Sequence, residues 1–265
     1  WIITGIFMAV RKAGETWWLR AGVFGFGFIL LLMMISPVFI SPLFNDYKPL
    51  AEGPVKSAIF SLARANQIPI DNVVYFDASK QTTRVSANVS GFAGTTQVSL
   101  NDNLLNKTSL PEIKAVMGHE MGHYVLNHSL RLAVYFSLTI MFGFWFVHVV
   151  LDKVIARFGV KYGITERTDP AVLPIALTVF SFLLLLLTPV TNSIVRQAEK
   201  EADLYGLNSA REPHGFATAA MRLSTYRKIE PGYWEEVIFY DHPSGYDRVH
   251  SSMLWLQENQ DSMAK

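Results

Sequence analysis

MGHEMGHYVL, residues 117–126, contains the pattern His-Glu-x-x-His and stands just ahead of a long uncharged run. Two histidines four positions apart project from one side of a helix, so His119 and His123 can bind the same metal ion. Glu120 lies beside that face, where it can take a proton from a water molecule at the metal. The stretch therefore predicts a zinc hydrolase centre at a membrane face. A coincidental polar stretch on an amphipathic helix is the alternative.

The composition of the chain is that of a membrane protein. Of its 265 residues, 50% are hydrophobic and 17% are charged, and the formal net charge is +1. A helix needs about 20 apolar residues to cross the hydrocarbon core of a bilayer. Three uncharged runs reach that length, and they cover 21–45, 132–151 and 171–195. Buried helices of a large soluble protein are the alternative, which three such runs disfavour.

Other features of the composition narrow the class of protein. The apolar residues 1–10 lack a starting Met and a signal-peptide n-region, so we expect them to be the tail of an earlier span and the chain to be a fragment. The absence of Cys removes disulfides, thiolate metal ligands and a Cys nucleophile. Because the chain has no basic stripe and no Gly-rich phosphate loop, we expect no nucleic-acid partner.

The polar segment between the first two spans predicts a small domain. An amphipathic helix is expected over 53–68 and a strand over 73–76. Two more strands, 85–92 and 96–100, are expected to form a hairpin around Gly94.

A helix is expected to start at Ser109. Ser109 stands at the cap position, Pro111 just inside it and Glu112 three residues on, which together form a capping-box signature. The helix would carry His119 and then continue without a break into the span at 132–151. The metal would therefore lie close to the bilayer surface.

A catalytic zinc needs a third protein ligand and an open position for water. No third His follows the motif closely, so a carboxylate on a separate helix is the other source of a ligand. After the third span a helix is expected over 196–205, with Gly206 as its stop, and two more over 216–227 and 246–257. Glu199 and Asp203 share one face of the first of these. One of them can bind the metal while the other accepts a hydrogen bond from a ligand imidazole. A solvated charged helix end is the alternative.

These residues resemble the integral-membrane gluzincin proteases, most closely the type I CaaX prenyl endopeptidase group and more distantly the heat-shock protease HtpX. The resemblance rests on HEMGH followed by Asn127-His128, and on NSIVRQAEKEAD at 192–203. It implies that Glu199 is the third zinc ligand, with Asp203 and Arg196 supporting the ligands, and that one Zn²⁺ binds per chain. Val195 stands where that family usually has Ser, at a position without chemistry.

A second block, DHPSGYDR at 241–248, resembles the His-Pro-x-x-x-x-Arg motif of the same family. The resemblance implies that His242 reaches the scissile carbonyl and that Arg248 fixes the local structure. An imidazole near the metal can donate a hydrogen bond to a developing oxyanion. Without the resemblance, His242 would be a loop residue before a Pro turn.

A third block is SANVSG at 86–91, where the family usually has Asn-Ala-x-x-x-Gly in an edge strand that pairs with the substrate backbone. Ser86 replaces the Asn. Strand addition needs only main-chain groups, so Ser86, Ala87 and Asn88 remain candidates for substrate binding. A side-chain contact from Ser86 is not expected.

The fold class is therefore expected to be mainly α with a small β-sheet, a multi-span helical membrane protein with a zincin-like catalytic domain. Its organisation is a remnant of an earlier span and loop over 1–20, membrane helices over 21–45, 131–151 and 171–195, a loop over 152–170, and catalytic parts over 46–130 and 196–265.

The predicted function is zinc-dependent endopeptidase activity in a lipid bilayer. The resemblance allows two substrate classes, the C-termini of prenylated proteins or membrane proteins under quality control. The alternative is a non-enzymatic scaffold or transporter subunit with a vestigial metal site, which the prolines Pro37, Pro42, Pro174 and Pro189 would suit. The spans contain almost no ionisable residue besides His148, which argues against transport. We expect His148 to be a packed or interfacial histidine.

The orientation of the protein stays open at this point. Basic residues precede the first span and fill the loop after the second, and they are Arg11, Lys12, Arg20, Lys153, Arg157, Lys161 and Arg167. The positive-inside rule puts this side in the cytoplasm and the catalytic part opposite. The resemblance implies the reverse, with catalysis toward the cytoplasm, and we favour it.

Overall fold

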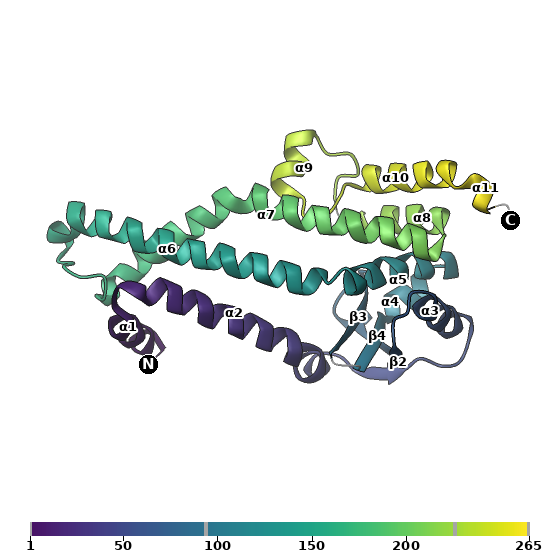
Figure 1. Cartoon of the computed structure of the whole chain (residues 1–265), viewed down its shortest axis with the longest axis horizontal. Coiled ribbons are helices and arrows are strands. Elements are labelled where there is room, and N and C mark those ends of the chain that lie inside the picture. Colours follow the sequence, from purple (N-terminus) through teal and green to yellow (C-terminus); the bar gives the residue numbers. More distant parts are fainter. Residues whose placement is uncertain (1, 93–94, 225–226, 264–265) are drawn as a thin grey trace. The chain divides into compact units, whose positions relative to one another are not determined.

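The computed structural model describes residues 2–92, 95–224 and 227–263 (Figure 1). The chain forms two compact units. A membrane unit comprises Trp1–Met33 and Leu130–Thr188, and a polar unit comprises Met34–Ser129 and Pro189–Lys265. Most of the described residues lie in helices, and the only sheet in the described part of the chain is small, in agreement with the expected fold class.

The membrane unit contains α1 (Ile2–Ala13), α2 (Trp17–Ile35) and most of α6 (His128–Tyr162), together with the first part of α7 (Leu173–Ala210). Three segments are long and apolar enough to cross a membrane, namely Thr4–Ile35, His128–Tyr162 and Pro170–Ala210. Close packing is visible where Gly22 meets Met141 and Gly143 meets Phe180. The protein is thus an integral membrane protein.

The first span differs from the expected one. Its helix begins at Trp17 and ends at Ile35, and it gives way to a π turn at Ser36–Ile40 and a 3₁₀ turn at Ser41–Leu43. Pro37 and Pro42 lack the N–H that a regular helix needs, so the α-helical ladder stops well before residue 45.

His148 is held within the membrane unit. Trp17 Nε1 lies 3.1 Å and Arg167 Nη1 lies 2.9 Å from His148 Nδ1. Arg167 also forms ion pairs with Glu15 at 2.8 Å and with Asp152. His148 therefore serves packing and hydrogen bonding in this unit.

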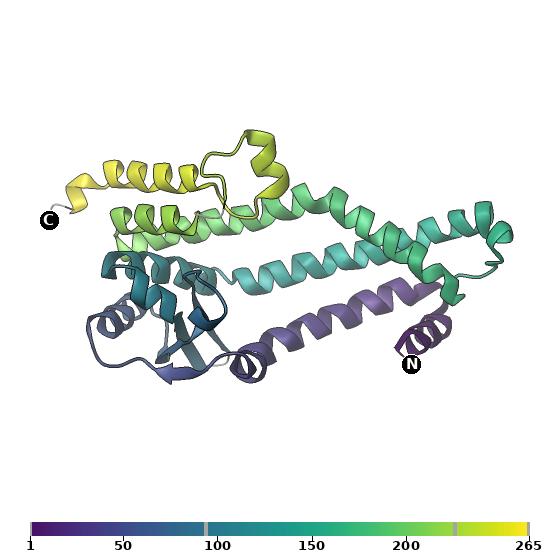
Figure 2. The ribbon, with the colours of Figure 1, turned by 180° about the vertical axis from the view of Figure 1, so that it is seen from behind.

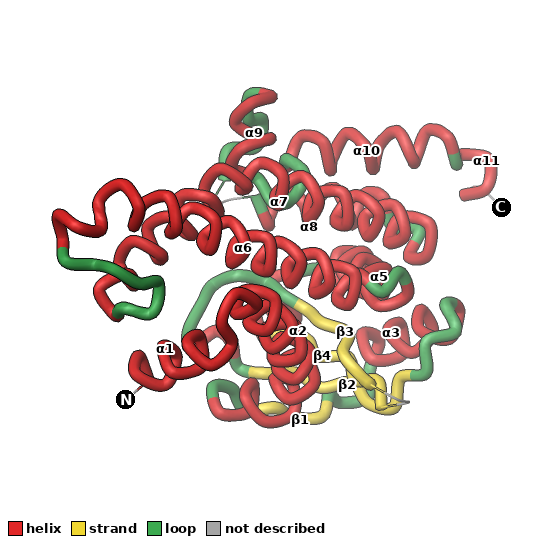
Figure 3. Tube along the Cα trace, turned by 60° about the vertical axis from the view of Figure 1, so that its left-hand side comes forward, coloured by secondary structure: helices red, strands yellow, loops and turns green. Residues whose placement is uncertain are grey.

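The polar unit is built on a four-stranded sheet of β1 (Tyr47–Pro49), β2 (Ile70–Phe76), β3 (Ala87–Phe92) and β4 (Thr95–Asn101), in the order β1-β2-β4-β3. β2 and β4 are parallel and the other two pairs are antiparallel. β3 and β4 are paired as the expected hairpin requires, while Gly94 lies outside the described residues. β1 was not predicted. β3 forms one edge of the sheet (Figure 3).

Helices α3 (Pro54–Ala65) and α5 (Leu110–Val125) complete the main core of this unit. Ile59 of α3, Met117 and Met121 of α5, and Val98 and Leu100 of β4 are almost fully buried in one cluster. The short α4 (Asp102–Lys107), which was not predicted, follows β4. The apolar face of α5 is thus anchored, which leaves its opposite face free to present the histidine motif.

The helix after Ser109 starts as expected but does not continue into the membrane. Ser109 N–H donates to Glu112 Oε2 at 2.7 Å. α5 then ends at Val125, and Asn127 adopts φ = 53°, a left-handed conformation that Asn tolerates better than most residues. α6 begins afresh at His128. The expectation of one unbroken helix was therefore wrong.

The remaining helices of the polar unit pack against α5. α8 (Pro213–Leu223) contacts both α5 and α10 (Gly245–Glu258), and Ala115, Phe216 and Trp255 share a second buried cluster. α8 and α10 lie side by side (Figure 2). α9 (Tyr233–Phe239) and α11 (Gln260–Met263) complete the chain and were not predicted.

Gly206 does not end its helix, because α7 continues to Ala210. It instead permits close contact with α5. A Cβ atom at Gly206 would lie 2.8 Å from the backbone nitrogen of His119, and one at Gly118 would lie 3.0 Å from the carbonyl oxygen of Gly206. Both contacts are with backbone, which cannot move aside cheaply.

Gly206→Ala is expected to push α7 away from the His119 backbone and to lower the free energy of unfolding by about 1–3 kcal/mol, the usual cost of overpacking. Thermal unfolding in detergent measures the loss. Gly232→Ala is the control, because a Cβ at Gly232 meets nothing within 4 Å. Equal melting temperatures for the two variants would contradict the close-packing explanation.

Candidate metal centre

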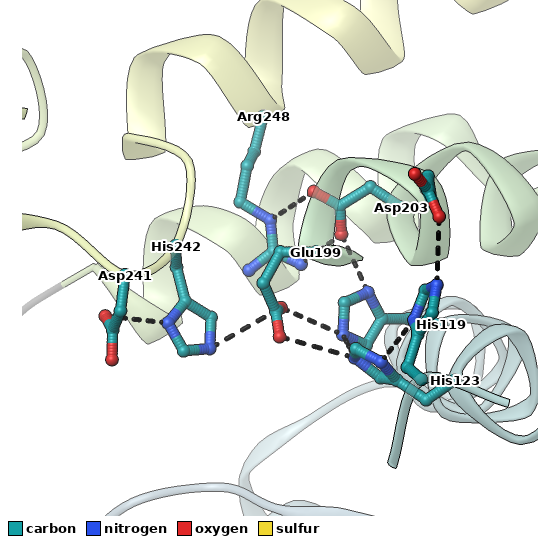
Figure 4. A network of polar contacts seen from close by, with 9 residues as sticks. His119, His123, Glu199, Asp203, Asp241, His242 and Arg248 are labelled. Atoms are coloured by element: carbon teal, nitrogen blue, oxygen red, sulfur yellow. Dashed lines mark hydrogen bonds and ion pairs between the residues drawn. The ribbon is translucent and has the colours of Figure 1, made fainter. Parts of the chain in front are cut away.

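Two helices that are far apart in the sequence bring together three side chains that could hold a metal ion. His119 and His123 come from α5, and Glu199 comes from α7 (Figure 4). Their ligand atoms all lie within 4.8 Å of one another. Glu199 Oε2 is 3.4 Å from His119 Nε2, and Glu199 Oε1 is 3.4 Å from His123 Nε2. The expected third ligand thus faces the same point as the two imidazoles.

The chemistry of this cluster fits a metal ion. Glu199 Oε2 is buried and has no hydrogen-bond partner among the residues that the structure describes. The Nε2 atoms of His119 and His123 face each other at 3.0 Å. A buried polar atom without a partner is costly, and a cation between these atoms would satisfy all of them. Two imidazoles and one carboxylate are also a common ligand set of a catalytic metal.

Asp203 links His119 to Arg248. Its Oδ1 lies 2.7 Å from His119 Nδ1, so the other ring nitrogen of His119 is left facing Glu199. Arg248, on α10, donates from Nε to Asp203 Oδ2 at 2.9 Å and from Nη2 to Oδ1. All three side chains are buried or nearly so. α10 is therefore tied to the metal cluster through one carboxylate.

The electrostatics of the cluster follow from burial and from this pairing. Burial opposes charge on His119, yet the Asp203 and Glu199 carboxylates raise its pKa to about 10 in the metal-free protein. Burial would raise the pKa of Glu199, but the two imidazoles hold it far below its usual range. Burial raises the pKa of Glu120, the residue between the two histidines. Glu120 is thus the carboxyl group here that accepts a proton most readily.

Asp203→Asn is expected to weaken metal binding by about 10–100-fold, because it removes the carboxylate that orients His119. It also leaves the buried Arg248 guanidinium without a counter-charge, which should lower the free energy of unfolding by about 3–5 kcal/mol. Competition with a chromophoric chelator and chemical unfolding measure the two effects. Asp261→Asn, at an exposed position on α11, is the control. Unchanged metal affinity would show that His119 does not depend on Asp203.

His242 approaches the cluster from the segment between α9 and α10. Its Nε2 lies 3.5 Å from Glu199 Oε2, and its Nδ1 lies 2.9 Å from Asp241 Oδ1. The hydrogen bond from His242 and the nearby Arg227 guanidinium, which is 2.9 Å from Asp241, keep the pKa of Asp241 below its usual range. Asp241 was not assigned a role from the sequence. Its position directly before His242 in the sequence was the one local indication that it could contact that imidazole.

Arg196 lies elsewhere than expected. It was placed next to the metal ligands, but its Nη1 donates to the carbonyl oxygens of Glu236, at 3.0 Å, and of Tyr240, and its Nη2 donates to Ser193 Oγ at 2.9 Å. Arg196 therefore holds the end of α9 and the chain leading to His242. The spacing on α7 could not reveal this, because both carbonyls come from another segment.

A cavity of about 170 Å³ opens onto the cluster. Its wall includes His119 and Glu199 of the candidate cluster, together with Glu120, His242 and Arg248. On the β3 side it is lined by Val85, Ser86 and Ala87, and on the α8 side by Phe216, Ala219, Ala220 and Leu223. Of the three expected substrate-binding residues, Ser86 and Ala87 line the cavity and Asn88 does not.

Two further residues near the cluster were missed. His128 is buried and its Nδ1 lies 2.9 Å from His123 Nδ1, and Glu201 Oε2 lies 3.1 Å from His128 Nε2. The neighbouring Asn127-His128 pair was noted only as part of a resemblance. A helix break between His123 and His128 is what allows the two rings to meet.

Comparisons with known proteins agree with this arrangement. The family model described as peptidase family M48 matches residues 49–252, and the one described as CAAX prenyl protease N-terminal, five membrane helices, matches residues 1–46. A relative named uncharacterized metalloprotease YhfN, from Bacillus subtilis, is 31% identical over 92% of this chain and 58% of its own length. CAAX prenyl protease 1 from Saccharomyces cerevisiae is 38% identical over 44% of this chain and 26% of its own length.

The fold is also found among solved structures. The crystal structure of S. mikatae Ste24p matches with a TM-score of 0.80 at 24% sequence identity, over 93% of this chain and 61% of that one. The chain spans little more than half the length of the B. subtilis relative. With the M48 match covering most of the sequence and the His119, His123 and Glu199 cluster inside it, the chain belongs to peptidase family M48.

Proposed function

We propose that this protein is a membrane-embedded zinc endopeptidase. The observation that carries the proposal is the convergence of His119, His123 and Glu199 at the wall of a cavity that Glu120 also lines. Membership in peptidase family M48 and the metalloprotease name of the B. subtilis relative support it. A scaffold or transporter would not need a general base beside a metal cluster.

Zinc is the metal that best fits the donor set, with one ion per chain held by His119, His123 and Glu199. Catalytic zinc takes three protein ligands from imidazoles and carboxylates and keeps one position open. When bound, zinc would supply Lewis acidity that polarises the scissile carbonyl and lowers the pKa of an attacking water.

The side chains of this protein then divide the remaining work. Glu120 takes the proton of the attacking water and passes it to the leaving amine. A raised pKa in the metal-free protein suits a carboxyl group that must hold this proton between the two steps. In its protonated form, in which both ring nitrogens carry a hydrogen, His242 donates a hydrogen bond from Nε2 to the carbonyl oxygen as negative charge develops there. Asp241 holds His242 for this role by accepting from its Nδ1.

The edge strand β3 can bind the substrate backbone. Ser86 exchanges hydrogen bonds with Asn101, since its C=O accepts from Asn101 N–H at 3.0 Å and its N–H donates to Asn101 Oδ1 at 3.1 Å. Because hydrogen-bonded pairs alternate along an antiparallel ladder, the backbone groups of Ala87 and Val89 are then directed to the outer edge. We therefore assign strand addition chiefly to Ala87 rather than to Ser86 or Asn88.

The substrates we propose are prenylated proteins cleaved near their C-termini. The names of the relatives from S. cerevisiae and Oryza sativa, CAAX prenyl protease 1 and its homolog, support this class. The resemblance noted in the sequence also favours a catalytic part on the cytoplasmic side of the membrane. Quality-control proteolysis of membrane proteins is the other substrate class that the resemblance allows.

Purified protein in detergent is expected to cleave a farnesylated CaaX peptide, to stop when a chelator removes the metal and to recover when zinc is added. The unmodified peptide and an unfolded membrane protein are the comparison substrates, and both should be cleaved more slowly. Cleavage of the unfolded membrane protein alone would replace the prenyl substrate with quality control. Chelator-insensitive cleavage, or none of any substrate, would contradict the zinc endopeptidase itself.

A further inference from the structure

A chain of three side chains extends from the candidate metal centre away from the cavity. His123 Nδ1 lies 2.9 Å from His128 Nδ1, and His128 Nε2 lies 3.1 Å from Glu201 Oε2. The two imidazole rings meet edge to face, with centroids 5.0 Å apart. His128 is only 1% exposed, so water does not compete for its nitrogens. Gln197 Nε2 donates to the other oxygen of Glu201 at 3.2 Å and steadies that carboxylate.

The direction of these hydrogen bonds follows from the Glu201 carboxylate, the last of the three side chains. An ionised carboxylate can only accept, so the hydrogen between Glu201 and His128 is on His128 Nε2. In a neutral imidazole the other nitrogen is an acceptor, so His128 Nδ1 accepts from His123 Nδ1–H. The lone pair of His123 is then on Nε2, the atom that faces Glu199 and His119.

We propose that His128 and Glu201 are positioning residues for the metal ligand His123, fixing its tautomer and its ring orientation. This inference rests on the proposed function, since it concerns a ligand of the proposed zinc. Asp203 serves His119 directly at 2.7 Å, whereas Glu201 serves His123 through an intervening imidazole. The two candidate ligand histidines are thus both oriented by carboxylates of α7, His119 by Asp203 and His123, through His128, by Glu201, which lies two residues before Asp203.

The local backbone explains why His128 is available for this role. A continuous helix would carry the residue five positions after His123 round to a different face. The left-handed Asn127 instead interrupts the helix and returns His128 toward His123. A histidine kept only for packing would not need both ring nitrogens aligned with a ligand nitrogen and a carboxylate.

The test compares two substitutions at one position. In His128→Gln the side-chain amide can still accept from His123 and donate to Glu201, whereas in His128→Phe it can do neither. We expect His128→Phe to weaken zinc binding by about 10–100-fold and His128→Gln to recover part of that loss. Zinc affinity is measured by chelator competition on the full chain. His214→Phe and His214→Gln, at an exposed position on α8, are the matched controls.

A second measurement does not depend on zinc. Nitrogen-15 NMR of the metal-free protein, labelled at histidine and assigned with a His123→Gln spectrum, reports the tautomer of His123. We expect the Nδ1–H form in the wild type and a mixture of tautomers in His128→Phe. Glu201→Ala, which alters a partly exposed side chain, should shift the tautomer and the zinc affinity in the same direction.

The outcomes separate the two proposals. If wild-type protein binds no zinc, the proposed function fails, and the tautomer of His123 still decides this inference. If zinc binds but His128→Phe keeps wild-type affinity, or if His123 carries its hydrogen on Nε2, the positioning role is overturned. Equal losses in His128→Phe and His128→Gln would overturn it as well, because a packing role predicts no rescue by the amide.

Discussion

Glu120→Gln is expected to lower kcat by about 10²–10⁴-fold while zinc stays bound, because the amide cannot accept the proton that the general base must take. Glu120 does not contribute a ligand atom to the cluster of His119, His123 and Glu199. The substitution preserves the size of the side chain in the wall of the cavity. Metal content by mass spectrometry and turnover of the best substrate in the assay above measure both expectations.

The matched control for this substitution is Glu230→Gln, at an exposed position outside the cavity. It removes the same charge from the protein and should leave kcat unchanged. Full activity of Glu120→Gln would refute the assignment of the base. Loss of zinc from that variant would instead show that Glu120 helps to hold the metal.

Glu199→Ala is expected to weaken zinc binding by more than about 100-fold. Mutation of a residue that only hydrogen-bonds to a metal ligand already lowers metal affinity by about 10–100-fold, and loss of a ligand should cost more. The substitution removes the only carboxylate of the predicted ligand set and leaves His119 and His123 to bind the ion alone. Activity should fall to the level of chelator-treated wild type, and excess zinc should restore little of it. Chelator competition gives the affinity directly.

Lys200→Gln is the control for this second substitution, because Lys200 is the exposed neighbour of Glu199 on α7. It should bind zinc as the wild type does. If Glu199→Ala kept wild-type zinc affinity, the third ligand would have to be another group. The proposal that α5 and α7 together form the zinc site would then be wrong.

Much of the candidate site is readable from local spacing. His119 and His123 are one helical turn apart, and the pitch of an α-helix alone puts them on one face. The same rule relates Glu199 to Asp203. The membrane spans were recognisable because a hydrocarbon core requires long uncharged runs. Their ends were not, since Pro37 and Pro42 stop a helix that hydropathy alone would extend.

Other features depend on segments that meet only in the folded chain. Gly206 resembles a helix stop, but its lack of a side chain instead allows α7 to pack closely against the backbone of His119. Arg196 resembles a partner of the ligands, but it binds carbonyl oxygens near α9. Glu201 received no role from the sequence, because its partner His128 is brought near it by the left-handed turn at Asn127.

The residue types and their periodicity therefore indicate the class of protein, the approximate membrane spans and the two histidines of the motif, because each depends on neighbours within a few residues. The choice of Glu199 over Asp203 as the third ligand came from the family resemblance, not from periodicity. The contacts between the carboxylate oxygens and the imidazole and guanidinium nitrogens of the cluster could not be predicted from local sequence. They depend on how closely α5 and α7 pack and on where α10 places Arg248, and those distances arise from contacts between segments that are widely separated along the chain.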